Sequence, residues 1–146
     1  MCHYIESLRV ENKQIKNLDL HNLRFNKTRE MIFSQRDFVD LEKLISIPEN
    51  INHSTYKCRL IYSKKGVENF SFTPYQKREI NSLQIVHADT LDYSFKNADR
   101  RELEKLKKNI YADEILIIKN GYVTDTSFSN IVFFDGEKWI TPSTYL

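Results

Sequence analysis

The chain has 146 residues, a formal net charge of +2 and a mean hydropathy of −0.55, which suits one domain or two small ones. Its 22 basic and 20 acidic residues nearly cancel, which argues against general binding of nucleic acid. The longest apolar runs, such as residues 115–118, are too short to span a membrane. No secretory signal is expected at the N-terminus, and two cysteines without CxxC spacing indicate reduced thiols in a cytoplasmic protein.

Alternating apolar and polar residues mark the expected strands. In chain order, we expect strands at residues 3–10, 14–18, 55–63, 67–73, 80–88, 114–119, 122–126, 130–134 and 138–141. All three glycines fall at expected hairpin turns. Asn120-Gly121 and Asp135-Gly136 have the composition of type I′ turns, in which both central residues need positive φ. The strands are therefore expected to pair mostly as antiparallel hairpins.

Three helices are expected between these strands. Asp19 can cap the first, and the second covers residues 38–46. The third covers residues 99–110, because Asp99 and Glu102 have the spacing of a capping box. Along the first helix, Leu20, Leu23, Lys27 and Met31 form one stripe, and Phe25, Thr28 and Ile32 form the next.

The expected domain boundary lies near residues 88–92, where strand character stops and a polar run begins. This predicts an N-terminal α/β domain at residues 1–90 and a C-terminal domain at residues 91–146. His3, His53 and His87 are isolated from other ligand types, so no metal site is expected.

A lone lysine, Lys96, lies where an apolar segment meets an expected helix start. Lysine becomes a useful nucleophilic amine when desolvation or nearby positive charge lowers its pKa. Tyr93, Phe95 and the positive end of the helix dipole would all act in that direction. On position alone, however, a surface lysine beside a helix is the better interpretation.

Several motifs in order change this interpretation. They are residues 6–10, residues 20–24 with His21 and Arg24 on one helix face, residues 95–100, residues 112–116, residues 121–131 and Thr141-Pro142. Together they resemble the class IV pyridoxal-phosphate enzymes, which include branched-chain aminotransferases, D-amino-acid aminotransferases and aminodeoxychorismate lyases. The resemblance covers nearly the whole chain.

The resemblance implies a role for each of five residues. Lys96 would form the Schiff base with the cofactor, and Arg24 would bind the cofactor phosphate. Asp125 would pair with the pyridine nitrogen, where the family usually has glutamate, and Asn130 would pin the loop after it. Arg100 would support the site, and its Lys-x-x-x-Arg spacing leans toward the lyase branch. The plain alternatives are a solvated helix residue for Arg24, an exposed hairpin residue for Asp125 and a helix-surface or ion-pair residue for Arg100.

The fold implied by the resemblance is α/β (α+β) with two domains. A small N-terminal antiparallel sheet with helices would be followed by a strand-rich C-terminal domain, with pyridoxal 5′-phosphate between them. Family members continue past Thr141-Pro142 into a segment with more phosphate contacts, so the second domain is expected to be incomplete at Leu146.

The resemblance also implies a homodimer acting on a small amino-bearing substrate, with no nucleic-acid or membrane partner. The preferred activity is that of aminodeoxychorismate lyase, which converts 4-amino-4-deoxychorismate to 4-aminobenzoate and pyruvate in folate biosynthesis. An amino-acid aminotransferase, acting on branched-chain or D-amino acids, is the first alternative. A non-catalytic relative that serves as a binding module is the second.

Overall fold

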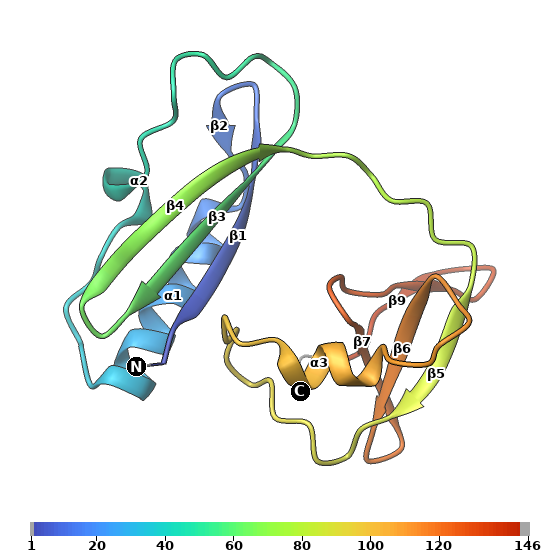
Figure 1. The fold of residues 1–146 in the computed structure, drawn as a ribbon. Helices are drawn as coiled ribbons and strands as arrows, with labels where there is room; N and C mark the ends of the chain where they lie inside the picture. The colour runs from blue at the N-terminus through green and yellow to red at the C-terminus, as the bar shows by residue number, and fades with distance from the viewer. Residues whose placement is uncertain (1, 144–146) are drawn as a thin grey trace. The chain divides into compact units, whose positions relative to one another are not determined.

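The structure is a computed structural model that describes residues 2–143 and divides into two compact units (Figure 1). The first unit holds Met1–Lys77 and Phe95–Ala98, and the second holds Arg78–Ser94 and Asp99–Leu146. This division differs from the expected boundary between residues 90 and 91. Helices and mostly antiparallel strands occur together, which confirms the α+β class.

The first unit contains a four-stranded antiparallel sheet in the order β2-β1-β3-β4 (Figure 1). Its strands are β1 (Tyr4–Glu11), β2 (Gln14–Ile15), β3 (Tyr56–Ser63) and β4 (Gly66–Pro74), close to the expected positions. Phe95–Ala98 lies against the start of β1. There, the Ile5 N–H donates to the Lys96 carbonyl at 2.9 Å, and Tyr4 and Asn97 form an antiparallel bridge.

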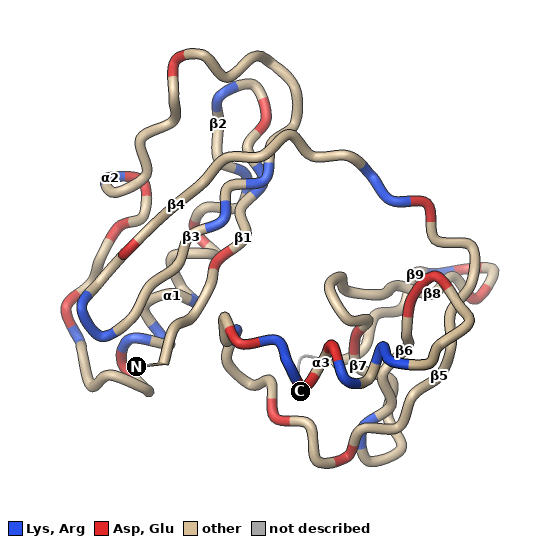
Figure 2. The backbone as a smooth tube through the Cα atoms, in the orientation of Figure 1, with Lys and Arg blue, Asp and Glu red and all other residues tan. Residues whose placement is uncertain are grey.

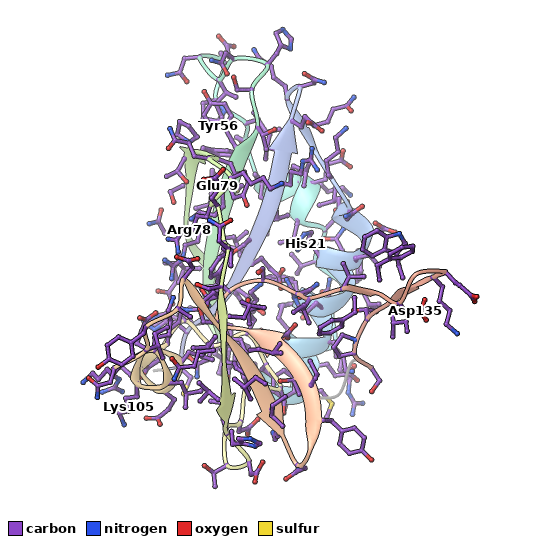
Figure 3. All side chains as sticks on the ribbon, turned by 90° about the vertical axis from the view of Figure 1, so that its right-hand side faces the viewer. His21, Tyr56, Arg78, Glu79, Lys105 and Asp135 are labelled. Atoms are coloured by element: carbon purple, nitrogen blue, oxygen red, sulfur yellow. The ribbon has the colours of Figure 1, made fainter. Side chains whose placement is uncertain are left out.

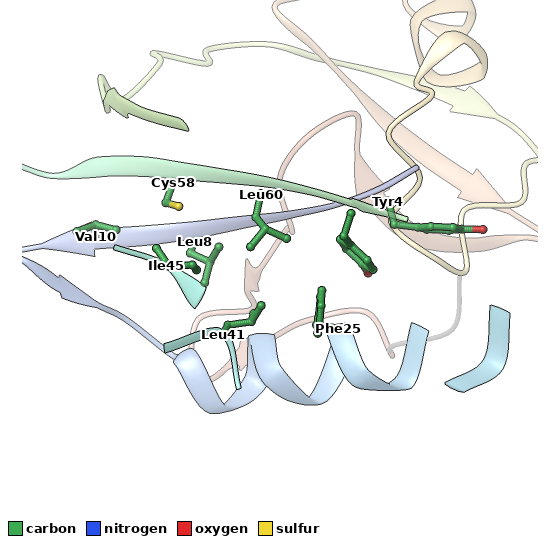
Figure 4. Packing of buried hydrophobic residues seen from close by; sticks show 9 residues of the cluster. Tyr4, Leu8, Val10, Phe25, Leu41, Ile45, Cys58 and Leu60 are labelled. Atoms are coloured by element: carbon green, nitrogen blue, oxygen red, sulfur yellow. The ribbon is translucent and has the colours of Figure 1, made fainter. Parts of the chain in front are cut away.

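One face of this sheet carries the core. Helix α1 (Leu18–Phe33) and the short helix α2 (Leu41–Leu44) pack on it (Figure 4). Every second residue of β1 points toward the helices, as strand geometry requires. The buried cluster consists of Tyr4, Leu8, Val10, Phe25, Leu41, Ile45, Cys58, Leu60 and Tyr62.

The helices differ from expectation in their ends and in the face that they bury. Helix α1 begins at Leu18 after Asn17, so Asp19 is in the first turn and the prediction that it caps the helix is wrong. Helix α2 has four residues where residues 38–46 were expected: the backbone is already extended at Asp40 before it and at Ile45 after it, although Leu41 and Ile45 are both buried in the core.

Phe25 and Thr28 of the second stripe of α1 are buried, whereas Ile32 at its end is 38% exposed and Leu23 of the first stripe is 67% exposed. The ring of Phe25 packs on that of Tyr62 at 4.5 Å between centroids, so contact with the sheet selects the helix face.

The second unit contains a three-stranded sheet and a two-stranded hairpin. In the sheet, β5 (Leu83–His87) pairs in parallel with β6 (Glu114–Lys119), and β6 pairs antiparallel with β7 (Tyr122–Thr126). The parallel pair was not expected from the hairpin pattern. It forms because α3 (Arg101–Leu106) lies along the chain between β5 and β6, and parallel neighbours need such a crossover. The hairpin consists of β8 (Phe133–Phe134) and β9 (Trp139–Ile140).

The second unit contains the two turns that were predicted to be of type I′. Asn120 and Gly121 have φ of 51° and 80°, which confirms the predicted type I′ geometry. At the other predicted turn, only Gly136 has positive φ, so type I′ is wrong there. The carboxylate of Asp135 instead accepts from two backbone N–H groups in the turn, those of residues 137 and 138.

Helix α3 is also shorter than residues 99–110 and begins at Arg101. Asp99 accepts from the Arg101 N–H, whereas Glu102 pairs with Lys105, so the capping box is wrong.

Acidic and basic residues are both scattered along each of the two units (Figure 2). Within residues 2–143, no helix combines the length and apolar character that crossing a membrane would require.

The two stripes of α1 give a direct test of the packing. Phe25→Ala should lower the free energy of unfolding by about 3–5 kcal/mol, because it empties a fully buried position. Leu23→Ala, on the exposed stripe of the same helix, should change it by no more than about 0.5 kcal/mol. Urea unfolding followed by circular dichroism measures both, and equal losses in the two variants would contradict the packing.

Candidate functional site

A buried ion cluster joins β1 to α1. The carboxylate of Glu6 is fully buried on the side of β1 that also presents Tyr4 and Leu8 to the core. It accepts from Arg24 through both oxygens, at 2.8 Å from Nε and by a second, short contact from Nη2. Nδ1 of His21, which lies on the same helix (Figure 3), is 2.7 Å from the second oxygen. The prediction that His21 and Arg24 share a helix face is therefore confirmed.

Glu6 is held in its charged form by these partners. Burial alone would raise the pKa of Glu6, but hydrogen bonds from Arg24 and His21 and the charge of Arg24 outweigh it and hold that pKa below its usual value. An ionised carboxylate can only accept hydrogen bonds, so Nδ1 of His21 carries the proton in this contact.

Lys96 lies in the same unit, against the same strand. Its side chain is half-buried, and its carbonyl accepts from Ile5, the neighbour of Glu6 on β1. Phe95 packs edge-to-face on Tyr4 with 6.5 Å between ring centroids. The first unit therefore brings the predicted lysine and the Glu6–His21–Arg24 cluster to the N-terminal half of one strand.

Asp125 and Asn130 belong to the second unit. Asp125 is half-buried on β7, between the buried residues Thr124 and Thr126. Asn130 is exposed after the loop that follows. The described hydrogen bonds of that loop centre on Thr126, whose hydroxyl accepts from the Ser129 N–H at 2.9 Å and donates to the Ser129 carbonyl at 2.7 Å. The pinning role of Asn130 therefore stays a prediction, as does the meeting of Asp125 with Lys96.

Two charged side chains fix the backbone of Ser127, two residues after Asp125. Arg100 donates to the Ser127 carbonyl and, at 3.2 Å, to the hydroxyl of Tyr93. The carboxylate of Glu114, which is fully buried, accepts from the Ser127 N–H at 3.3 Å. Arg100 thus connects the start of α3 to the loop after β7 and is more than a solvated helix residue.

Glu114 is the counterpart of Glu6 in the second unit. It also accepts from the Ile115 N–H at 2.8 Å and from Lys107 at 3.1 Å. Burial would raise the pKa of Glu114, but the hydrogen bonds from Ile115, Ser127 and Lys107 lower it overall. The loop after Asp125 is therefore anchored to a buried charge.

Glu6 and Glu114 were not predicted as site residues. The sequence does contain a signal for both. Glu6 occupies the apolar side of an alternating strand between Tyr4 and Leu8, and Glu114 opens the apolar run of β6. A charged residue at a position that the pattern reserves for the core needs a buried partner, and in both cases that partner is a cation.

By chemical type, Lys96 and Arg24 of the first unit and Asp125 of the second suit a phosphorylated aldehyde with a basic ring nitrogen. A half-buried amine at Lys96, a guanidinium at Arg24 and a carboxylate at Asp125 match the aldehyde, the phosphate and the ring nitrogen in turn. Glu6 holds the plane of the guanidinium through its Nε–Nη2 edge, which directs the other N–H bonds away from Glu6. These residues therefore fit pyridoxal 5′-phosphate by their chemistry.

Comparison with known proteins gives a sequence-family match. A model of the family described as amino-transferase class IV matches residues 4–145. An uncharacterised protein of Haemophilus influenzae is 34% identical over 149 residues, which covers 100% of this chain and 79% of that protein.

Solved structures agree. A Haemophilus somnus protein, provisionally named a 4-amino-4-deoxychorismate lyase, has a TM-score of 0.83 and 30% identity, over 97% of this chain and 75% of that one. A Thermotoga maritima protein, provisionally named a branched-chain amino acid aminotransferase, has a TM-score of 0.70 over 96% of this chain and 56% of that one. Its 16% identity supports the fold alone. With a family match over nearly all of its length, the chain belongs to the class IV aminotransferases, a family of pyridoxal-phosphate-dependent enzymes.

Proposed function

We propose that this chain binds pyridoxal 5′-phosphate through Lys96 and acts on a small amino-bearing substrate, with aminodeoxychorismate lyase as the first candidate activity. The observation that carries the proposal is the placement of Lys96 and Arg24 in one unit, against the same end of β1. The similarity to the Haemophilus somnus protein supports the lyase assignment.

Lys96 would supply the amine that joins the cofactor. Its backbone is tied to β1 on one side, and the residue is half-buried. The neutral form of the lysine amine is the one that would react with the cofactor aldehyde. After the substrate amine takes its place, Lys96 would be the base that moves the proton at the substrate carbon.

Arg24 and Asp125 would hold the two ends of the cofactor. Arg24 would donate to the phosphate with two-point geometry. The carboxylate of Asp125 would accept a hydrogen bond from the protonated ring nitrogen, over a side chain one methylene shorter than that of glutamate. When bound, pyridoxal 5′-phosphate supplies an aldehyde and a protonated ring that withdraws electrons from the reacting carbon. The protein's task is to orient this group and to keep the ring nitrogen protonated.

Homodimer formation remains a prediction from family membership, and a cytoplasmic location remains a prediction from the two cysteines without CxxC spacing. The aminotransferase alternative is favoured by the family's own description and by the name of the Thermotoga maritima protein. The binding-module alternative would apply if the chain takes up no cofactor.

Trapping the cofactor tests the role of Lys96. The purified chain incubated with pyridoxal 5′-phosphate should gain a visible absorption band, and borohydride reduction should fix the cofactor to the peptide that contains Lys96. Lys96→Ala should lose both signals. Lys105→Ala, on the exposed surface of α3 (Figure 3), should keep both. A band that survives in Lys96→Ala, or an adduct on another lysine by peptide mass spectrometry, would contradict the assignment.

Product analysis tests the reaction and Asp125 together. With 4-amino-4-deoxychorismate and no keto-acid acceptor, the chain should release 4-aminobenzoate and pyruvate. Asp125→Asn should lower kcat/KM roughly ten- to hundredfold, since it removes a charge-assisted hydrogen bond worth about 1.5–3 kcal/mol. Asp125→Glu should retain most activity, and Asp19→Asn, an exposed residue of α1, should retain all of it. Turnover only of an amino acid with a keto-acid acceptor would instead favour the aminotransferase.

A further inference from the structure

Burying the Glu6 carboxylate costs desolvation free energy, and a gain in stability does not account for its presence in the core. It is fully buried on the core face of β1, where Tyr4 and Leu8 are its neighbours. Replacing a buried ion pair with apolar residues of similar volume is often neutral or stabilising. A leucine at this position would extend the apolar cluster, so the carboxylate calls for another reason.

Glu6 fixes the orientation of the Arg24 guanidinium. The side chain of Arg24 is 44% exposed, and an arginine so placed on a helix surface samples many rotamers. Contacts from Nε and Nη2 to the two carboxylate oxygens fix both the position and the plane of the guanidinium. Because the donors of arginine form a rigid planar fork, fixing one edge also fixes the direction of the other.

His21 further restrains the Glu6 carboxylate. Its Nδ1 lies 2.7 Å from the same Glu6 oxygen that accepts from Nη2 of Arg24, so the carboxylate is restrained from two positions one helical turn apart. The His21 side chain is only 16% exposed, and Glu6 is not exposed at all. A carboxylate held in this way cannot follow Arg24 if the guanidinium swings outward.

We propose that Glu6 is a positioning residue for a phosphate monoester: it presents the outer edge of the Arg24 guanidinium in one fixed orientation, with His21 as its second restraint. This inference rests on the proposed function, in which Arg24 binds the cofactor phosphate. It adds that recognition comes from a pre-set geometry and not from an excess of positive charge, because Glu6 and Arg24 together are neutral.

The readout is the preference for a phosphorylated ligand. Dissociation constants for pyridoxal 5′-phosphate and for pyridoxal, which lacks only the phosphate, are measured on the full chain by absorbance titration. The ratio of the two constants reports the phosphate contact. Internal cyclisation of free pyridoxal affects its constant equally in every variant and cancels when ratios are compared.

Two substitutions at Glu6 separate geometry from charge. Glu6→Gln keeps the size but removes the charge and one acceptor, and Glu6→Asp keeps the charge but withdraws the acceptors by one methylene. Both should reduce the phosphate preference about tenfold, the effect of losing one well-aligned charge-assisted hydrogen bond. Both should leave the affinity for pyridoxal nearly unchanged. An increased preference in Glu6→Gln would overturn the proposal, because it would mean that Glu6 merely offsets the charge of Arg24.

A double-mutant cycle tests whether Glu6 acts through Arg24. Arg24→Gln should abolish most of the phosphate preference, and adding Glu6→Gln to it should have no further effect on that ratio. Additive losses would overturn the proposal. His21→Gln leaves the Glu6–Arg24 contact in place, so it should give a smaller loss of about two- to threefold, and it provides a measurement if the Glu6 variants fold poorly.

The outcomes also separate this inference from the function on which it rests. Wild-type protein that binds neither ligand, with no adduct at Lys96, would overturn both. Wild-type protein that prefers pyridoxal 5′-phosphate, with the same preference in Glu6→Gln, Glu6→Asp and His21→Gln, would leave the function standing and overturn the role of Glu6 alone. Circular dichroism and urea unfolding of each variant show whether a parallel loss of both ligands reflects unfolding.

Discussion

The first unit depends on one constraint: a carboxylate placed in an apolar core must be satisfied completely. Glu6 shares the core face of β1 with Tyr4 and Leu8, and an unpaired charge there would be prohibitive. Only the adjacent helix can supply partners, and it does so with His21 and Arg24. The pairing of His21 and Arg24 with Glu6 and the packing of Phe25 on Tyr62 therefore favour the same rotation of α1, which leaves the guanidinium at the edge of the core.

The second unit also contains a buried carboxylate whose hydrogen bonds are satisfied, that of Glu114. That carboxylate is buried at the start of β6 and accepts from Lys107 and from the backbone of Ser127, while Arg100 donates to the carbonyl of Ser127. In each unit a buried glutamate thus restrains a segment that carries a predicted cofactor contact: Arg24 in one, the loop after Asp125 in the other. Restraint of this kind is what a binding site needs, because a ligand then meets side chains already in place.

Sequence patterns predicted the features that depend on residues close together in the chain. Strand positions followed the alternation of residues, and the Asn120-Gly121 turn followed from the need for positive φ. The buried face of α1, the shortness of α2 and the parallel pairing of β5 with β6 did not follow, because contacts distant in sequence decide them. Lys96, Arg24 and Asp125 could be proposed from ordered motifs.

Glu6 and Glu114 were missed for a physical reason. A strand pattern shows that a charge is out of place but not which cation neutralises it. That cation is identified only when the fold brings residues 6 and 24, or residues 114 and 107, together.

A crystal structure of the chain with pyridoxal 5′-phosphate would test the account most directly. It should place a phosphate oxygen about 2.7–3.2 Å from the Arg24 guanidinium, on the edge away from Glu6, with the contact between Nε and Glu6 unchanged and Nζ of Lys96 joined to the cofactor. A phosphate bound elsewhere, or an Arg24 side chain that has released Glu6 in order to reach it, would contradict the account.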